Sequence, residues 1–256
     1  MKRLFWDIET SPNLGYFWSI GYKVRLTYEN ILKERAIICI CWKWEDKKKV
    51  HSLTWDNGDD KKMVTEFLPI LKEADEAVAH NGDKFDMKWF NTQCLKYGLV
   101  VPEIKTVDTL VIARRRFKFN SNRLDYLGQL LLGKGKIHTE YQLWKDVCAG
   151  DKEALRKMVV YCKNDVGGLL QPVWEKLQKF HKPKSHMGVM LNRDKWTCPE
   201  CGSKDVHINK TYATTAGSKR YGMMCKSCGR YYTIPSRSYL DYLEKVPHTH
   251  KVEGVF

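Results

Sequence analysis

Residues 4–9 read Leu-Phe-Trp-Asp-Ile-Glu, an apolar run that ends in two acidic residues separated by one position. In a β-strand, residues i and i+2 point to the same face, so Asp7 and Glu9 would place two carboxylates side by side. Adjacent anions repel each other, and a bound cation relieves that repulsion. Carboxylate oxygens are the ligands that Mg²⁺ and Mn²⁺ prefer. The pattern suits a metal site at the end of a first strand. Taken alone, it more often marks an exposed acidic strand end, and acidic partners elsewhere in the chain are needed to favour the metal site.

The composition limits the class of protein. With 256 residues, of which 43% are hydrophobic, the chain can form one sizeable domain and a small one. No run of about 18 apolar residues occurs in the sequence, and we therefore expect no membrane span. The basic start Met1-Lys2-Arg3 is soon followed by Asp7 and Glu9, which argues against a signal peptide and predicts a cytoplasmic protein.

The charge of the chain is strongly basic, with 44 Lys and Arg against 30 Asp and Glu and a net charge of +14. Residues 182–256 contain 13 basic and 6 acidic residues and so contribute +7 of that excess. A positive field of this size favours a polyanionic partner such as nucleic acid, although a merely soluble basic protein can carry the same charge.

The apolar pattern alternates between strands and helices. We predict strands at residues 3–9, 36–44, 50–55 and 77–79. We predict helices at residues 60–73, 84–97, 108–117, 122–132, 140–148 and 151–180. This order predicts an α/β fold for residues 1–183, with a mixed sheet flanked by helices.

The composition changes after residue 183. Residues 184–195 read as a linker, and residues 196–236 form a short segment that contains glycines and four cysteines and is rich in Tyr, Thr and Lys. Residues 237–256 carry no readable motif and are expected to form a tail. We therefore predict a small second domain at residues 196–236.

Two later motifs carry further acidic residues. The sequence His80-Asn-Gly-Asp-Lys-Phe-Asp86 stands at a predicted strand-to-helix junction, where side chains are presented at the edge of a sheet. Both Asp83 and Asp86 can supply a carboxylate there, and the alternative role for each is to cap the helix. In the last long helix, Tyr161 and Asp165 are four positions apart and so lie on one face.

The order Asp-x-Glu, Asn-x-x-x-Phe-Asp and Tyr-x-x-x-Asp resembles the DEDD superfamily of 3′→5′ exonucleases. The resemblance is to the tyrosine-bearing branch, which includes the proofreading domains of family-B DNA polymerases. It covers about residues 1–180, and Val-Asp-Thr-Leu at 107–110 and Leu-Asp-Tyr-Leu-Gly at 124–128 support it. It implies a ribonuclease H-like fold and two Mg²⁺ or Mn²⁺ ions, and its Phe-Asp pairing favours Asp86 over Asp83.

The resemblance also implies a role for each motif residue. Asp7 would contact both ions, Glu9 and Asp165 would complete the protein ligands of one ion, and Asp86 would serve the other, partly through water. Tyr161 would orient the attacking water rather than act as a strong base. Two ions about 4 Å apart can stabilise both the attacking and the leaving oxygen of an in-line displacement. The implied reaction releases nucleoside 5′-monophosphates from a 3′ end.

Four of the nine cysteines form two C-x-x-C pairs, each followed by Gly, with 23 residues between Cys201 and Cys225. Four thiolates at this spacing suit one tetrahedral Zn²⁺ and predict a structural zinc ribbon, with a redox role as the alternative. The other five cysteines show no such spacing and, without a secretion signal, indicate a reducing compartment. The predicted zinc ligands are Cys198, Cys201, Cys225 and Cys228.

Polar and basic residues close to these motifs are candidate contacts to nucleic acid. Some follow the predicted helix 108–117 or belong to the sequence Gly-Lys-Gly-Lys, and others alternate with tyrosines in the ribbon, a pattern that suits phosphate contact and base stacking. A solvated charged face, and tyrosines that pack the ribbon core, are the alternatives. The set comprises Asn81, Arg114, Arg115, Arg116, Lys118, Lys134, Lys136, Lys219, Arg220 and Arg230.

These observations predict a metal-dependent 3′→5′ exonuclease with a C-terminal zinc ribbon. DNA is favoured over RNA, with a single-stranded 3′ end as the expected substrate, and a replication or repair protein acting in trans is a further expected partner. Two alternatives stay open: a structure-specific endonuclease of the same fold, and a non-catalytic nucleic-acid-binding adaptor. The complete set of acidic residues argues against the adaptor, because a decayed site would have lost a ligand.

Overall fold

The chain divides into two units, one formed by Lys2–Leu177 and the other beginning at Gln178. The computed structural model describes residues 1–21, 23–181 and 185–246. Each unit has its own sheet and its own apolar core, and each is described separately below.

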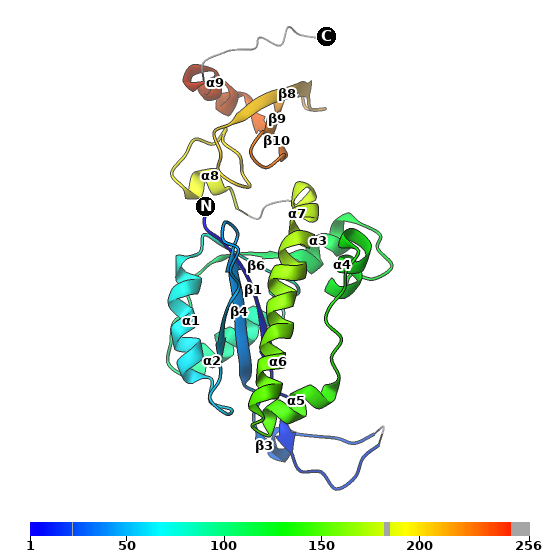
Figure 1. The fold of residues 1–256 in the computed structure, drawn as a ribbon. Helices are drawn as coiled ribbons and strands as arrows, with labels where there is room; N and C mark the ends of the chain where they lie inside the picture. Colours follow the sequence, from blue (N-terminus) through cyan, green and yellow to red (C-terminus); the bar gives the residue numbers. More distant parts are fainter. Residues whose placement is uncertain (22, 182–184, 247–256) are drawn as a thin grey trace. The chain divides into compact units, whose positions relative to one another are not determined.

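Strand β1, Arg3–Thr10, lies at the centre of a five-stranded sheet with the order β5-β4-β1-β6-β7 (Figure 1). It pairs antiparallel with β4 on one side and parallel with β6 on the other. The prediction of a mixed α/β sheet flanked by helices is confirmed. The other strands of the sheet are β4 Ile37–Trp44, β5 His51–Thr54, β6 Glu76–Ala79 and β7 Lys105–Asp108.

One face of the sheet is covered by helices α1, Lys61–Glu73, and α2, Asp86–Lys96 (Figure 1). Trp6 of β1 stacks on Phe67 of α1 with 5.4 Å between the ring centroids. It also meets the ring of Phe90 of α2 edge-on at 6.1 Å. This aromatic cluster fixes which side chains of β1 point into the α1/α2 layer.

The opposite face of β1 is covered by α6, Lys152–Lys163. Cys162 of α6 places its Sγ 3.6 Å from the backbone oxygen of Asp7. Because side chains alternate along a strand, Asp7 and Glu9 share the face opposite to Trp6. The two carboxylates therefore lie beneath α6 and the turn that follows it.

The helix predicted over residues 151–180 changes its pitch in the middle. After α6 the backbone forms a π-helix, η2, Asn164–Leu170, and then returns to α-helical geometry in α7, Gln171–Leu177. A π-turn accommodates one extra residue, and such turns occur frequently at functional sites. Asp165 is the second residue of this wider turn and is 1% exposed.

The remaining helices of the first unit connect β7 to α6. Strand β7 was not predicted, because its sequence Lys-Thr-Val-Asp contains a single apolar residue. Its last residue, Asp108, is the N-cap of α3 and accepts a hydrogen bond of 2.9 Å from the backbone N–H of Leu110. The helices are α3 Thr109–Arg116, α4 Leu124–Leu132 and α5 Tyr141–Cys148.

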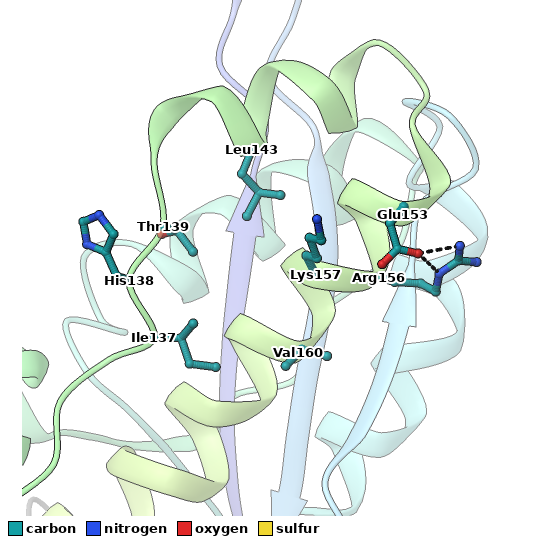
Figure 2. Close-up of a pocket in the computed structure, with 8 residues that line it drawn as sticks. All are labelled: Ile137, His138, Thr139, Leu143, Glu153, Arg156, Lys157 and Val160. Carbon is teal, nitrogen blue, oxygen red and sulfur yellow. Dashed lines mark hydrogen bonds and ion pairs between the residues drawn. The ribbon is translucent and has the colours of Figure 1, made fainter.

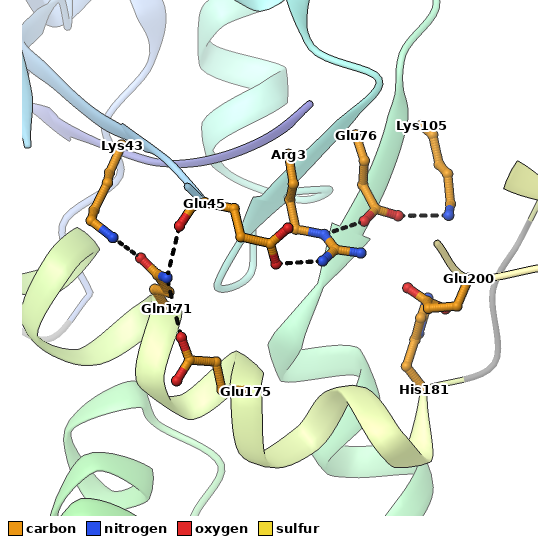
Figure 3. A network of polar contacts seen from close by, with 9 residues as sticks. All are labelled: Arg3, Lys43, Glu45, Glu76, Lys105, Gln171, Glu175, His181 and Glu200. Atoms are coloured by element: carbon orange, nitrogen blue, oxygen red, sulfur yellow. Dashed lines mark hydrogen bonds and ion pairs between the residues drawn. The ribbon is translucent and has the colours of Figure 1, made fainter. Parts of the chain in front are cut away.

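A buried ion-pair network joins three strands at the N-terminal end of β1 (Figure 3). Arg3, which is 3% exposed, donates to Glu76 Oε2 at 2.5 Å and to Glu45 Oε1 at 2.6 Å. Lys105 Nζ of β7 lies 2.6 Å from the other carboxylate oxygen of Glu76. Each of these buried charges is paired, and the network links β1 to β6 and β7 through Glu76.

Residues 11–21 and 23–35, for which we predicted no secondary structure, form a projection that we term the aromatic arm. Its base is a short two-stranded sheet of β2, Leu14–Gly15, and β3, Ile31–Lys33. The 3₁₀ turn η1, Tyr28–Asn30, leads directly into β3. Trp18 is fully exposed, and Tyr28 is 80% exposed. The arm thus carries large apolar side chains that the core of the first unit does not cover.

The second unit contains a three-stranded antiparallel sheet with the order β10-β9-β8. Its small core includes Trp196, which packs edge-on against Tyr242 with 5.4 Å between the centroids. Tyr239 stacks on Tyr221 at 3.8 Å. The elements are η3 Gln178–Phe180, α8 Met187–Met190, β8 Val206–Ala213, β9 Lys219–Cys225, β10 Tyr231–Pro235 and α9 Ser236–Lys245.

Two predictions for this part of the chain need correction. Residues 237–245, predicted as part of a tail, belong to helix α9, because Tyr239 and Tyr242 on one face of that helix pack into the unit's core. The predicted linker 184–195 contains the short helix α8. Residues 247–256 of the predicted tail lie outside the described residues. Within the ranges that the structure describes, none of the helices has the length and apolar character needed to cross a bilayer.

Candidate active site

Strand pairing positions the first two carboxylates. β6 pairs with β1 only as far as Phe5, so on that side the Asp7–Glu9 segment of β1 extends beyond its neighbour. On the other side, Asp7 lies opposite Cys41 of β4, and Glu9 lies opposite Cys39. The backbone therefore holds the acidic end of β1 rigidly from one side and leaves room for other side chains on the other.

Asp86 occupies the open side of β1. It is the first residue of α2 and is 1% exposed, and its Oδ1 accepts a hydrogen bond of 3.0 Å from the backbone N–H of Ile8. Asp83, the other acidic residue of this motif, lies towards Asp108, whose pKa it helps to raise after the larger effect of burial. The geometry thus favours Asp86 over Asp83 as the partner of Asp7.

Asp165 completes an acidic cluster above β1. One carboxylate oxygen each from Asp7, Glu9 and Asp165 lies within 4.8 Å of the other two. The Oδ1 atom of Asp165 is buried and has no hydrogen-bond partner in the described part of the chain. A buried anionic oxygen without a partner costs free energy unless a cation binds to it. The structure therefore brings together three of the four predicted ligands and places Asp86 beside them.

Tyr161 lies on the helix face that carries Asp165. Its ring meets Trp144 of α5 edge-on at 6.1 Å, which fixes the direction of the hydroxyl. Burial, and then the charge of Asp165, raises the pKa of Tyr161 to about 12. The hydroxyl is therefore protonated near pH 7, so that it can orient a water molecule but cannot act as a strong base.

Lys136 enters the acidic cluster from the loop between α4 and α5. Its Nζ donates to Asp165 Oδ2 and, at 3.2 Å, to the hydroxyl oxygen of Tyr161. Its backbone N–H donates to Asp125 Oδ1 at 2.7 Å, which anchors the loop. Burial lowers the pKa of Lys136, but the charges of Asp165 and Asp7 outweigh this effect and raise it overall. The sequence indicated a nucleic-acid contact here, and it did not indicate that this lysine reaches the carboxylates.

The carboxyl groups of the cluster raise one another's pKa. Burial, and then the charges of Asp86, Glu9 and Asp165, hold the pKa of Asp7 well above its usual range. Burial raises the pKa of Asp86 to about 7 and also raises the pKa of Asp165. Burial, followed by Cys39, has the same effect on Glu9. A divalent cation would remove this repulsion, and an all-oxygen donor set fits Mg²⁺ or Mn²⁺.

The predicted contacts to nucleic acid are distributed over both units. Asn81 has a left-handed backbone with φ of 68°, and its N–H donates to Asp108 Oδ1 at 3.0 Å. In the second unit, Arg230 donates to the backbone oxygen of Lys179 at 3.2 Å. Arg220 is half-buried, and the exposed members of the set are Arg114, Arg115, Arg116, Lys118, Lys134 and Lys219. Their contact with nucleic acid stays a prediction.

The four cysteines of the second unit converge on one point. Cys198 Sγ lies 3.6 Å from Cys228 Sγ, Cys201 Sγ lies 3.7 Å from Cys225 Sγ, and all four sulfurs are within 4.8 Å of one another. Gly202 follows the first pair with φ of 71°, and its N–H donates to the Cys198 oxygen at 2.8 Å. Four soft donors at these separations fit a closed tetrahedral ion, and the identity of that ion as zinc stays a prediction.

A family model described as the RNase_H superfamily matches residues 4–171. Among curated proteins, the chain is similar to a DNA polymerase of Thermococcus hydrothermalis, with 30% identity over 101 residues. That match covers 39% of this chain and 6% of the polymerase. A DNA polymerase of Pyrococcus glycovorans is 28% identical over 104 residues, which are 40% of this chain and 12% of that protein.

Among solved structures, the chain resembles the family B DNA polymerase from the hyperthermophilic archaeon Pyrobaculum calidifontis. The TM-score is 0.54 with 17% identity, over 70% of this chain and 24% of the polymerase. At this identity the likeness shows a shared fold. The chain spans only a small part of the length of the polymerases that it matches.

Proposed function

The chain belongs to the RNase H superfamily, and from that premise we propose that it is a metal-dependent 3′→5′ exonuclease. It hydrolyses phosphodiester bonds of nucleic acid and releases nucleoside 5′-monophosphates. The observation that carries the proposal is the convergence of oxygens from Asp7, Glu9 and Asp165 within 4.8 Å, with Asp86 bound to the same strand. Such a cluster is unfavourable by itself, because each buried carboxylate raises the pKa of its neighbours.

Each side chain of the cluster has a distinct task in this proposal. Asp7, Glu9, Asp86 and Asp165 would hold two Mg²⁺ or Mn²⁺ ions. When bound, such a pair stabilises the attacking and leaving oxygens of an in-line phosphoryl displacement. The neutral Tyr161 hydroxyl aligns the attacking water.

Lys136, which pairs with Asp165, also lies where it can contact the reacting phosphate. Its ammonium group is already held at the edge of the cluster by Asp165 and Tyr161. A cation at that place can pair with a non-bridging oxygen of the substrate and so retain the phosphate as charge develops. Lys136 therefore acts as a phosphate contact inside the site rather than along the path that leads to it.

A groove between α6 and the segment that follows Lys136 is a candidate path for the strand. It has a volume of about 390 Å³ and lies next to Lys136 and Tyr161 in sequence, since Ile137 and Val160 form part of its wall (Figure 2). Apolar side chains there can contact a base, while the cationic groups can contact phosphates. The lining on α6 extends from Val160, next to Tyr161, to Glu153, eight residues or about 12 Å of helix before Tyr161. The groove is lined by Ile137, His138, Thr139, Leu143, Glu153, Arg156, Lys157 and Val160.

The aromatic arm is a second candidate contact to a single strand. Tyr16, Phe17 and Trp18 are between 54% and 105% exposed, and Lys23 and Arg25 are exposed close to them in sequence. Exposed rings between cations suit stacking of unpaired bases with simultaneous contact to phosphates. This combination supports a single-stranded substrate.

DNA is the favoured substrate, because the relatives named above are DNA polymerases. The cysteine cluster of the second unit would hold a structural Zn²⁺, and the basic residues of that unit would add to binding. A replication or repair protein that works with this chain in trans stays a prediction.

The test is incubation of the protein with Mn²⁺ or Mg²⁺ and 5′-labelled single-stranded DNA or RNA, each with a free or a blocked 3′ end. We expect a ladder of shortened products that requires the free 3′ end and disappears in Asp7→Asn. Asp83→Asn, which changes an acid outside the cluster, is the matched control and should stay active. Internal cuts in blocked substrates would indicate an endonuclease, and binding without any cleavage would indicate an adaptor.

A further inference from the structure

Three of the cysteines that show no regular spacing in the sequence meet in space beside the acidic cluster. Cys39 and Cys41 are two positions apart on β4 and point to the same face of the sheet, and Cys162 comes from α6. Their three sulfurs lie within 4.8 Å of one another, and all three residues are fully buried. The two remaining cysteines outside the ribbon differ, because Cys94 belongs to α2 and Cys148 is exposed.

Strand register places these thiols directly beside the proposed catalytic carboxylates. Cys41 is the cross-strand partner of Asp7, and Cys39 is the cross-strand partner of Glu9, so all four side chains share one face of the sheet. Cys162 Sγ lies 3.6 Å from Asp7 Oδ2. The cysteine sulfurs, which are soft donors, thus lie next to the carboxylate oxygens, which are hard donors, and Asp7 is the residue where the two sets meet.

We propose that Cys39, Cys41 and Cys162 form a binding site for a thiophilic d¹⁰ ion of the Zn²⁺ class, with Asp7 as the nearest oxygen donor. In a tetrahedral zinc site the metal–sulfur distance of about 2.3 Å places sulfurs about 3.8 Å apart. Sulfurs that already lie within 4.8 Å of one another need to approach by no more than about 1 Å. Three thiolates and one carboxylate give a four-coordinate set that Mg²⁺ does not use.

Binding of the ion is an exchange of protons for metal–sulfur bonds. Each thiol releases its proton to water as its sulfur binds, with no change in oxidation state. The hydrogen that Cys162 now directs towards Asp7 is lost, and the carboxylate turns towards the new cation. The half-buried Asp7 joins the thiol cluster to the acidic cluster and so provides the route of entry.

The consequence rests on the function proposed above. If Asp7 holds the catalytic ions, then an ion at the thiol cluster withdraws that ligand and inhibits hydrolysis. Zn²⁺ or Cd²⁺ would therefore inhibit the enzyme in the presence of excess Mg²⁺. The binding event itself does not depend on catalysis, so the two proposals can be tested separately.

The first experiment measures binding. The full chain is titrated with Cd²⁺, and thiolate-to-metal charge-transfer absorption is recorded together with the bound metal per chain. We expect wild type, Cys94→Ala and Cys148→Ala to bind one ion more than Cys41→Ser and Cys162→Ser do. Thermal unfolding verifies that each variant is folded, and Cys39→Ser provides a further folded variant if one of the others fails to fold. Equal stoichiometry and equal absorption in wild type and in the folded Cys39, Cys41 or Cys162 variants would overturn the proposal.

The second experiment separates this site from the proposed catalytic site. Asp7→Asn should retain the thiolate absorption while it loses nuclease activity. In active variants, Cys41→Ser should raise the Zn²⁺ concentration needed for half-inhibition by roughly tenfold or more, as expected when a supporting ligand is lost. Inhibition by Zn²⁺ that is identical in wild type and Cys41→Ser would show that the ion acts at the carboxylates alone and would refute the regulatory role.

Discussion

The Oδ1 atom of Asp86 accepts a hydrogen bond of 3.0 Å from the backbone N–H of Ile8. This contact joins the first turn of α2 to the acidic end of β1, where β6 no longer pairs. It serves the backbone and the carboxylate cluster at once. Asp86 therefore satisfies an N–H that the sheet leaves unpaired on that side, while its charge adds to the field at Asp7.

Asp86→Asn should separate these two roles. The amide oxygen of asparagine can still accept the bond from Ile8, so the fold should persist, but the charge that attracts a cation is lost. We expect nuclease activity to fall by roughly 100-fold, with a change in melting temperature of only a few degrees. Asp83→Asn, three positions earlier, should leave activity within about twofold of wild type. Comparable losses in the two variants would show that the cluster has been assigned to the wrong acid.

Lys136→Met should impair the protein in a way that added metal partly corrects. The lysine is the cation that pairs with Asp165 in the absence of a metal. Removing one partner of a buried pair leaves the other uncompensated, at a cost of about 3–5 kcal/mol for full burial and less here, since Lys136 is 30% exposed. We expect a lower melting temperature without Mg²⁺ or Mn²⁺, a smaller deficit with either ion, and reduced activity in both cases.

Lys134→Met is the matched control for Lys136, because Lys134 is an exposed residue of the same loop. It should change the melting temperature little and weaken binding of the substrate only through its charge. Thermal unfolding with and without Mn²⁺, combined with activity assays, distinguishes the two lysines. A Lys136→Met protein as stable as Lys134→Met at every metal concentration would contradict the ion pair with Asp165.

The stability of the metal-free protein should depend on pH in a defined direction. Asp86 has a pKa of about 7 in the folded protein, whereas an unfolded aspartate has a pKa of about 3.9. The folded state therefore binds the proton more tightly, and the free energy of unfolding decreases as the pH rises from about 4 to about 7. The free energy of unfolding falls by about 1.4 kcal/mol for each unit by which the folded pKa of Asp86 exceeds its unfolded pKa.

Thermal unfolding between pH 5 and pH 8, in buffer without added Mg²⁺ or Mn²⁺, tests this relation. We expect the melting temperature to fall across this range, and Mn²⁺ or Mg²⁺ to restore it most at high pH, where the carboxylates are ionised. Asp86→Asn should make the dependence less steep, because one of the carboxyl groups with a raised pKa is removed, while Asp7, Glu9 and Asp165 still titrate. A melting temperature that rises with pH in the metal-free wild type would contradict the raised pKa.

Loss of the ribbon metal should affect the second unit selectively. Its core contains few residues, and two of them, Cys198 and Cys225, are themselves predicted ligands. Cys201→Ser or Cys228→Ser should therefore unfold that unit, whereas Cys148→Ser, an exposed cysteine of α5, should not. Near-ultraviolet circular dichroism and proteolysis within residues 185–246 would report the unfolding.

The ribbon variants should also bind nucleic acid less strongly. The first unit carries the acidic cluster and should retain hydrolysis of short substrates. If the basic residues of the second unit contact phosphates, the slope of binding affinity against salt concentration should become less steep in Cys201→Ser than in Cys148→Ser. Identical slopes in the two variants would refute a role for this unit in binding nucleic acid.

Much of the fold follows from short-range patterns in the chain. The alternation of side chains along a strand places Asp7 and Glu9 on one face. The helical period places Tyr161 and Asp165 on one face of their helix. The two C-x-x-C-G sequences likewise predict that their four cysteines converge in the second unit. These features depend on the backbone conformation of a few consecutive residues, which local composition specifies well.

Other features were decided by tertiary packing alone. Strand β7, with one apolar residue, is recognisable only by its pairing with β6. The sequence of the aromatic arm shows neither the apolar period of a helix nor that of a strand. Nothing near Lys136 in the sequence indicates that its ammonium group reaches Asp165, 29 residues later. Nor does any spacing join Cys162 to Cys39 and Cys41, more than 120 residues away.

The physical reason for this division is the range of the interactions. Hydrogen bonding and side-chain alternation within a strand or helix are set by residues a few positions apart. The acidic cluster, the lysine beside it and the thiol cluster beneath α6 instead depend on strand register and on how α6 and η2 pack over β1 and β4. Those arrangements minimise the free energy of the whole unit, and no local pattern of residues specifies them.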